Sequence, residues 1–112
     1  MRAGKLRHLV EFEVPLVELD SSGVQTESWE AAFDGQQISA AIEPLSGREL
    51  IAAQQVHSRV TTRITVRYRP GLTAAMRVVH RDVKYNIEAV IADADSGYRH
   101  ATLLCYSGTN EG

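Results

Sequence analysis

The stretch SRVTTRITVRYR, residues 58–69, has the clearest two-residue alternation in the chain. Every second side chain from Val60 to Tyr68 is apolar or Thr, and the side chains between them are Arg or Thr. Such alternation is typical of a β-strand with one buried face. Pro70 and Gly71 follow and fit the central positions of a type II turn, where Gly supplies the positive φ. This stretch therefore predicts a half-buried strand that ends in a tight turn.

The segments on both sides of this strand also favour β-structure. We expect further strands at residues 8–14, 25–33, 37–43, 76–79, 83–91 and 98–106, with turn residues between them. Strands separated by turns about every ten residues indicate an antiparallel all-β fold. The sequence therefore predicts a mainly β protein, a small antiparallel β-barrel or sandwich of six to seven strands with one short helix in a long loop. We expect one domain at residues 1–106 and a disordered polar tail at 107–112.

The short helix is predicted inside IEPLSGRELIAAQQV, residues 42–56. Ser46 and Glu49 have the spacing of a capping box, and Leu45 and Leu50 that of a hydrophobic staple. A helix of about ten residues is marginal in water unless it packs on something. Its apolar side chains form only a thin stripe: Leu50, Ile51, Ala53 and Val56. Two interpretations follow: the helix plugs one end of a barrel, or it meets a neighbouring subunit.

Charge is unevenly distributed along the chain. The 12 basic residues against 14 acidic ones give a net charge of −2, which argues against a whole-protein nucleic-acid binder. From Glu11 to Glu43 every charged residue is acidic, whereas from Arg48 to Arg81 there are seven arginines and one acid, Glu49. This separation fits either two solvated faces of a monomer or head-to-tail contact between copies.

The arginine face of the 58–69 strand is the most specific chemical feature. Alternate side chains on a strand lie about 6.8 Å apart and would form a ridge of charged, planar donors. The members of this predicted partner-binding ridge are Arg59, Arg63, Arg67 and Arg69. Its ligand is either a nucleic-acid backbone or an acidic protein surface. Because Tyr68, the one nearby aromatic residue, falls on the apolar face, base stacking has no support and we favour a protein partner.

The sequence contains no set of residues with the spacing of a catalytic site. The four histidines lack metal-ligand spacing, and nucleotide-binding and nucleophile motifs are absent. The single cysteine, Cys105, rules out a disulfide framework, and no apolar run reaches the roughly 20 residues of a membrane span. We therefore expect a soluble protein of a reducing interior with no enzyme activity, catalytic residue, metal, cofactor or membrane contact.

An ordered series of short segments carries a family resemblance. The series is the turn at 20–23, Trp29, and the segments 42–49, 52–55, 61–69, 76–78, 85–88 and 103–105. This order resembles the head closure proteins of tailed bacteriophages, also called head–tail joining or head–tail adaptor proteins. The likeness extends over residues 4–106. One departure is His80-Arg81-Asp82, where relatives often have a glycine-bearing turn.

The resemblance implies a small β-barrel that forms a dodecameric or hexameric ring beneath the portal or adaptor protein. The ring would close the DNA-filled head and provide the docking surface for the tail terminator or tail-completion protein. Packaged DNA would pass through its channel without sequence-specific binding. The location implied is the virion connector, and the host cytoplasm during assembly.

The resemblance also implies that the excursion at residues 44–55 lines the channel and contacts neighbouring copies. The residues carried over to this role are Pro44, Leu45, Ser46, Arg48, Glu49, Leu50, Ile51, Gln54 and Gln55. The arginine ridge would then face a protein, because a channel that bound phosphate strongly would hinder DNA transit. The alternative function is a small OB- or SH3-like barrel that binds single-stranded nucleic acid through the arginine face.

Overall fold

The computed structural model describes residues 6–94, 97 and 99–107 of the chain. Within these residues the fold is mainly β, with seven antiparallel strands in one sheet and one short α-helix. The elements in chain order are β1 (His8–Leu19), β2 (Gln25–Ala31), the 3-10 turn η2 (Phe33–Gly35), β3 (Ile38–Pro44), α1 (Gly47–Val56), β4 (Thr62–Arg67), β5 (Arg77–His80), β6 (Val83–Ala92) and β7 (His100–Ser107).

The sheet closes in a ring. Its strand order is β2-β1-β3-β4-β7-β6-β5, and an additional pairing of β5 with β1 closes six of these strands into the ring. The closing is possible because β1 is long: its residues 8–10 pair with β3, 11–13 with β5 and 13–19 with β2. Strand β2 pairs with β1 and lies outside the ring. The mainly β prediction of six to seven strands with one short helix is confirmed, with a single closing sheet in place of two layers.

The core lies on the inner face of this ring. Its largest fully buried side chains include Phe12, Ile64, Leu103 and the valines 10, 60, 66 and 78. Apart from Val60, which lies just before β4, they come from strands far apart in the sequence, so the hydrophobic stabilisation is shared by the whole ring. The alternation that predicted β4 is confirmed for residues 60, 62, 64 and 66, which are all buried.

Two parts of the prediction for residues 58–69 are wrong. The strand is only Thr62–Arg67, because β3 pairs with it only as far as Val66 and β7 only as far as Arg67. Tyr68 therefore lies beyond the sheet and is 46% exposed instead of facing the core. On the arginine face, Thr65 is buried between its ladder partners Ala41 and Thr102, so this face is not continuously exposed.

Two strand ends also differ from the sequence-based expectation, and the turn predicted at residues 80–82 is confirmed. The strand predicted up to Phe33 ends at Ala31, because Phe33, Asp34 and Gly35 all adopt positive φ values in η2. The hairpin without glycine between β5 and β6 closes with Arg81 at φ 57°. At the other end of the chain, Ser107 of the predicted tail is the last residue of β7, and residues 108–112 lie outside the described part.

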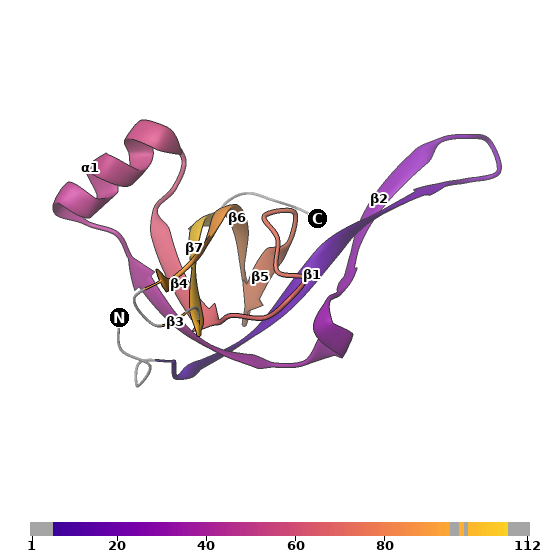
Figure 1. The fold of residues 1–112 in the computed structure, drawn as a ribbon. Coiled ribbons are helices and arrows are strands. Elements are labelled where there is room, and N and C mark those ends of the chain that lie inside the picture. The colour runs from indigo at the N-terminus through magenta and orange to yellow at the C-terminus, as the bar shows by residue number, and fades with distance from the viewer. Residues whose placement is uncertain (1–5, 95–96, 98, 108–112) are drawn as a thin grey trace.

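Two elements project from opposite ends of the ring, as Figure 1 shows. One is the outer part of the β1–β2 hairpin, residues 15–29, which we call the arm. The other is the excursion that carries α1. These projections give the molecule its elongated dimensions of 49 × 30 × 25 Å. Each projection therefore presents side chains that the ring itself does not cover.

Candidate functional site: the helix excursion, the arginine strand and the arm

The excursion leaves and rejoins the sheet at one place. Pro44, the last residue of β3, pairs with Thr62 at the start of β4. The next residue, Leu45, is buried, and its backbone N–H donates to the carbonyl oxygen of Thr61 at 2.9 Å. Residues 46–60 therefore form a loop whose two ends are held side by side, and α1 lies within it.

The helix begins without the predicted capping box. Ser46 has the extended backbone of an N-cap, but its side chain makes no capping hydrogen bond. Glu49 instead accepts a hydrogen bond from Arg63 Nη1 at 2.6 Å. A charge-assisted bond to a guanidinium is stronger than a bond to a neutral backbone N–H, which explains why Glu49 turns toward the sheet. The capping-box prediction is therefore wrong, although the helix lies where it was expected.

The outward side of α1 is exposed and largely apolar. Leu50, Ala53 and Gln54 are half-buried on the side toward the body, where Gln54 Nε2 donates to the Val60 carbonyl oxygen at 2.9 Å. On the other side Ile51 is 63% and Val56 76% exposed. The helix has no buried residue. The interpretation of α1 as a plug is wrong, because a plug would bury its apolar side; contact with a neighbouring copy stays a prediction.

The other residues of the excursion that were predicted to line the channel or contact neighbouring copies are exposed. Arg48 and Gln55 are exposed on the outward side of α1, together with Ala52. Pro44 and Ser46 are exposed at the approach to the helix. The excursion therefore presents a surface with two aliphatic side chains, two small or amide side chains and one cation.

Arg63, at the centre of the predicted ridge, is engaged within the chain. Its Nε lies 3.4 Å from Glu43 Oε1, and its Nη1 bonds Glu49 Oε2. The hydrogen bond that Arg63 donates to Glu49 raises the pKa of Arg63 above its ordinary value, against the opposing effect of burial. Arg63 thus ties α1 to β3 and β4 and is only partly available to a partner.

The remaining three arginines of the ridge have different environments. Arg59 lies 3.5 Å from Glu88 and its guanidinium stacks on the Tyr106 ring at 4.5 Å. Arg69 Nη1 donates to Gln36 Oε1 at 3.1 Å, and its guanidinium lies over the Phe33 ring. Arg67 is exposed and has no side-chain partner within the described residues. The ridge is therefore not a uniform row of free charges, and its partner-binding role stays a prediction.

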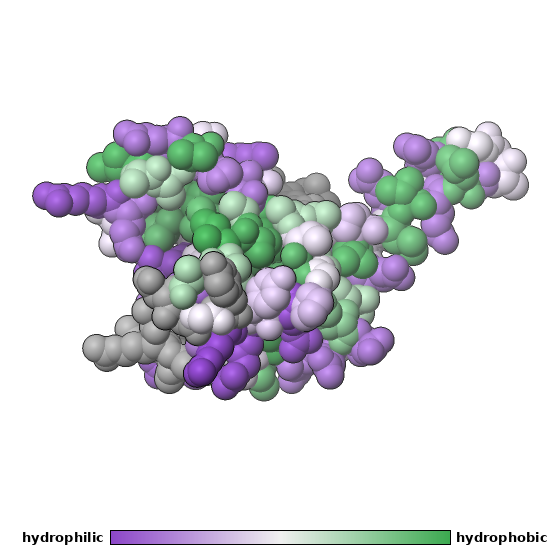
Figure 2. All heavy atoms as spheres, viewed as in Figure 1, coloured by the Kyte–Doolittle hydropathy of each residue, from purple (hydrophilic) through white to green (hydrophobic). Residues whose placement is uncertain are grey.

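The sequence analysis missed the arm. It ended the first strand at residue 14, whereas β1 continues to Leu19. Val17 is 51% and Leu19 67% exposed, and Val24 is exposed at the tip. Figure 2 shows apolar side chains on both this projection and the helix. The signal was the apolar–acidic pattern PLVELD at residues 15–20, which continues strand alternation into the turn.

A buried arginine holds the base of the arm. Arg77 of β5 is 2% exposed, and its Nε donates to Glu13 Oε1 of β1 at 2.7 Å. Its guanidinium also lies 4.1 Å from the centroid of the Trp29 ring on β2. One side chain therefore fixes both strands of the arm to the ring. The sequence placed Arg77 and Trp29 on separate strands and gave no sign that they meet.

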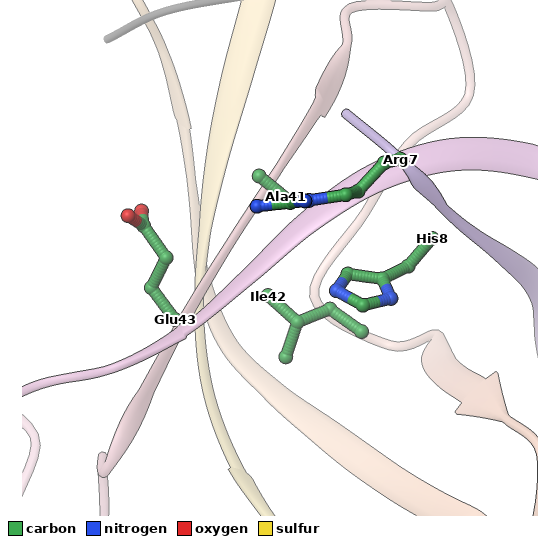
Figure 3. Close-up of a pocket in the computed structure, with 5 residues that line it drawn as sticks. All are labelled: Arg7, His8, Ala41, Ile42 and Glu43. Carbon is green, nitrogen blue, oxygen red and sulfur yellow. The ribbon is translucent and has the colours of Figure 1, made fainter. Parts of the chain in front are cut away.

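A small cavity of about 150 Å³ lies at the start of β1 and is lined by Arg7, His8, Ala41, Ile42 and Glu43. Figure 3 shows Arg7 reaching across Ala41, with His8 beside Ile42 and the Glu43 carboxylate apart from both. The Glu43 carboxylate is already paired with Arg63. The lining therefore does not bring an acid and a base together in the way that proton-transfer chemistry requires.

The surroundings of two further side chains, Cys105 and His80, shift their pKa values. Burial raises the pKa of Cys105 to about 12, which keeps the thiol protonated. Burial, followed by the charges of His8 and Arg81, lowers the pKa of His80. Across residues 6–94, 97 and 99–107, no group of three His, Cys, Asp or Glu side chains could hold a metal ion. The same residues include no helix long and apolar enough to cross a membrane.

The exposed aliphatic side chains on the two projections are typical of surfaces that contact other molecules. The chain belongs to the family of phage head completion proteins, which it matches over residues 1–108. It is therefore a structural component of the phage head, located in the virion. No match was found among curated proteins.

Two solved structures have the same fold. One is the solution structure of protein SF1141 from Shigella flexneri 2a, with a TM-score of 0.77 and 23% identity over 99% of this chain and 100% of that one. The other is a chain in the virion of a native gene transfer agent particle, with a TM-score of 0.61 and 16% identity over 94% of this chain and 97% of that one. At these identities the likeness describes the fold.

Proposed function

We propose that this protein forms a ring beneath the portal or adaptor protein of a phage, closes the DNA-filled head, and provides the surface on which the tail docks. The observation that carries this proposal is the pair of projections at opposite ends of a small closed sheet. Membership of the head completion family supports the same role. The likeness to a chain in a gene transfer agent virion agrees with it.

The two projections favour a protein that functions in an assembly of copies over one that functions as a monomer. A two-stranded hairpin is at best marginally stable in water, and a helix of this length needs something to pack on. Contacts between unlike surfaces of identical chains generate closed rings when the rotation closes. A dodecameric or hexameric ring would cover both projections in every copy, which an isolated monomer leaves in solvent.

Within the ring, residues 44–55 are proposed to face the channel and neighbouring copies. The portal or adaptor protein would contact one rim, and the tail terminator or tail-completion protein the other. Arg59, Arg67 and Arg69 are proposed to face acidic protein surface, because each neutralised phosphate adds affinity for DNA and would hinder its passage. Packaged DNA would pass without sequence-specific binding.

Deletion of the gene from the phage or prophage tests the proposal. Electron microscopy of the lysate is expected to show unjoined tails beside tailless heads that have lost DNA. Supply of the wild-type gene in trans is expected to restore joined particles. Intact, joined virions from the deletion strain would contradict the proposed function.

The alternative, binding of single-stranded nucleic acid, has weaker support. Arg63 is engaged by two carboxylates, and the Tyr106 and Phe33 rings are already stacked with Arg59 and Arg69. Fluorescence anisotropy with labelled single strands at low and high salt would test it. Affinity that falls steeply with salt would favour this alternative.

A further inference from the structure

The outer face of the arm is an apolar surface that the chain itself does not cover. Pro15, Val17 and Leu19 of β1 share this face with their partners Trp29, Glu27 and Gln25 of β2. All three β1 residues are exposed. Contiguous exposed apolar surface with a polar border is typical of an interaction site. The question is which surface covers it.

We propose that the arm of one copy docks on the outward side of helix α1 of a second copy. This inference specifies which two surfaces meet between neighbouring copies in the proposed ring. Only the closing of the ring rests on the proposed function. The helix side in question carries Arg48, Ile51, Ala52, Gln55 and Val56, all exposed. Aliphatic side chains from the two copies would then cover one another.

The charges of the two surfaces are complementary. The outer face of the arm carries Glu27, and the rest of the arm adds Glu18 on the opposite face, Asp20 in the turn, and no basic residue. The outward side of α1 carries Arg48, and the neighbouring acid, Glu49, is engaged by Arg63. Opposite charges around an apolar contact steer encounter and disfavour wrong pairings, so the acidic arm would avoid another arm and select the helix.

The conformation of the arm is also fixed by contacts within the chain, so the arm does not have to become ordered when it binds. At its tip, Asp20 Oδ1 accepts the N–H groups of Ser22 and Val24 at 2.8 and 2.9 Å, and Gly23 supplies a φ of 84°. At its base, Arg77 bonds Glu13 and stacks on Trp29. A surface fixed at both ends loses less conformational freedom on binding.

The arrangement requires two copies. Arm and helix extend from opposite ends of a molecule that is 49 Å long, so one chain cannot bring them together. An arm-to-helix contact joins unlike surfaces and leaves a free arm and a free helix at the ends of each pair. Such a contact propagates from copy to copy and closes when the rotation allows it.

Thiol cross-linking between two single-cysteine variants of the full chain tests the proposal. An equimolar mixture of Leu19→Cys and Ile51→Cys, at millimolar concentration, is treated with a short bismaleimide. The control mixture pairs Leu19→Cys with Val83→Cys, since Val83 is an exposed aliphatic residue outside α1, at the hairpin between β5 and β6. The buried Cys105 is replaced by Ala in all variants, which are checked for native circular dichroism.

The Leu19–Ile51 mixture is expected to give a covalent heterodimer at several times the yield of the control mixture. A second step uses charge. Adding Glu27→Lys to the arm variant is expected to lower the yield several-fold, and adding Arg48→Glu to the helix variant as well is expected to restore it. Equal yields from test and control mixtures, or yields unaffected by the reversals, would overturn the proposal.

This test and the gene-deletion test can fail separately. Unjoined heads and tails without an arm-to-helix cross-link would keep the head-closure function and reject this contact, leaving another virion protein as the occupant of the arm. A specific, charge-dependent cross-link with normal virions from the deletion strain would support the contact and reject the function.

Discussion

The two projections of this molecule are alike in outline and differ in how they are held. Both leave the rim of the sheet, both turn at a glycine with positive φ (Gly23 and Gly47), and both carry exposed aliphatic side chains. The arm is held at its base by the buried Arg77, whereas the helix is held by the half-buried Arg63 through two carboxylates. Because surface ion pairs are weak and screened, we expect the arm to keep its direction and the helix to adjust.

The largest effect is expected at the base of the arm. Glu13→Ala removes the carboxylate that bonds Arg77 and leaves a guanidinium buried without its charged partner. Breaking a buried ion pair from one side typically costs about 3 kcal/mol or more. We expect a loss of this order in the free energy of unfolding, measured by urea denaturation. Glu11→Ala, an exposed position on the same strand, is the control and is expected to change stability by less than about 0.5 kcal/mol.

A smaller and more local effect is expected at the base of the helix. Arg63→Ala removes the bonds to Glu43 and Glu49, with an expected loss of about 1 kcal/mol because the pairs are partly exposed. Hydrogen exchange should show faster exchange in α1. The thiol of Cys105, whose pKa burial raises to about 12, should stay as slow to label as in the wild type. Arg67→Ala is the control; faster labelling of Cys105 would mean that the ring itself had opened.

The tip of the arm should respond less than its base. Asp20→Ala removes the carboxylate oxygen that accepts two backbone N–H groups in an exposed turn. The expected loss is about 1 kcal/mol, the usual net value of such bonds. Asp20→Asn keeps an acceptor oxygen and should lose less than half of that. Equal losses for the two variants would show that charge, not hydrogen bonding, holds the turn.

Much of the fold could be predicted from the sequence because its pattern is local. Period-2 alternation located the strands to within a few residues, except for the outer half of β1, and turn residues separated them. The closing of the sheet could not be predicted in the same way. It depends on β1 pairing with β3, β5 and β2 in turn, and no single segment of the sequence contains that information.

The candidate site was predicted in part. The position of the helix and the resemblance were confirmed, since both rest on short, ordered segments. The ridge of free arginines was predicted only from the alternation of side chains along the strand. This alternation cannot show that Glu43 and Glu49 lie within reach of Arg63. It also cannot show that Glu88 lies within reach of Arg59. The arm was missed because Pro15 interrupts the run of strand-forming residues after Val14, although the alternation resumes and continues to Asp20.

The smallest effect is expected at Ser46, and it separates the capping box from the observed network. An N-cap Ser→Ala change typically costs about 1 kcal/mol, but here the Ser46 side chain makes no capping bond, so Ser46→Ala should cost less than about 0.5 kcal/mol. In an Arg63→Ala background Glu49 is released and becomes free to bond the Ser46 backbone N–H. If the capping box then forms, the Ser46 hydroxyl also accepts the Glu49 backbone N–H, and this is the bond that Ser46→Ala removes. The cost of Ser46→Ala should therefore rise in the Arg63→Ala background, which a double-mutant cycle by urea denaturation measures. A full cost in the wild-type background would mean that the Ser46 hydroxyl already caps the first turn, and would contradict a helix end without a side-chain cap.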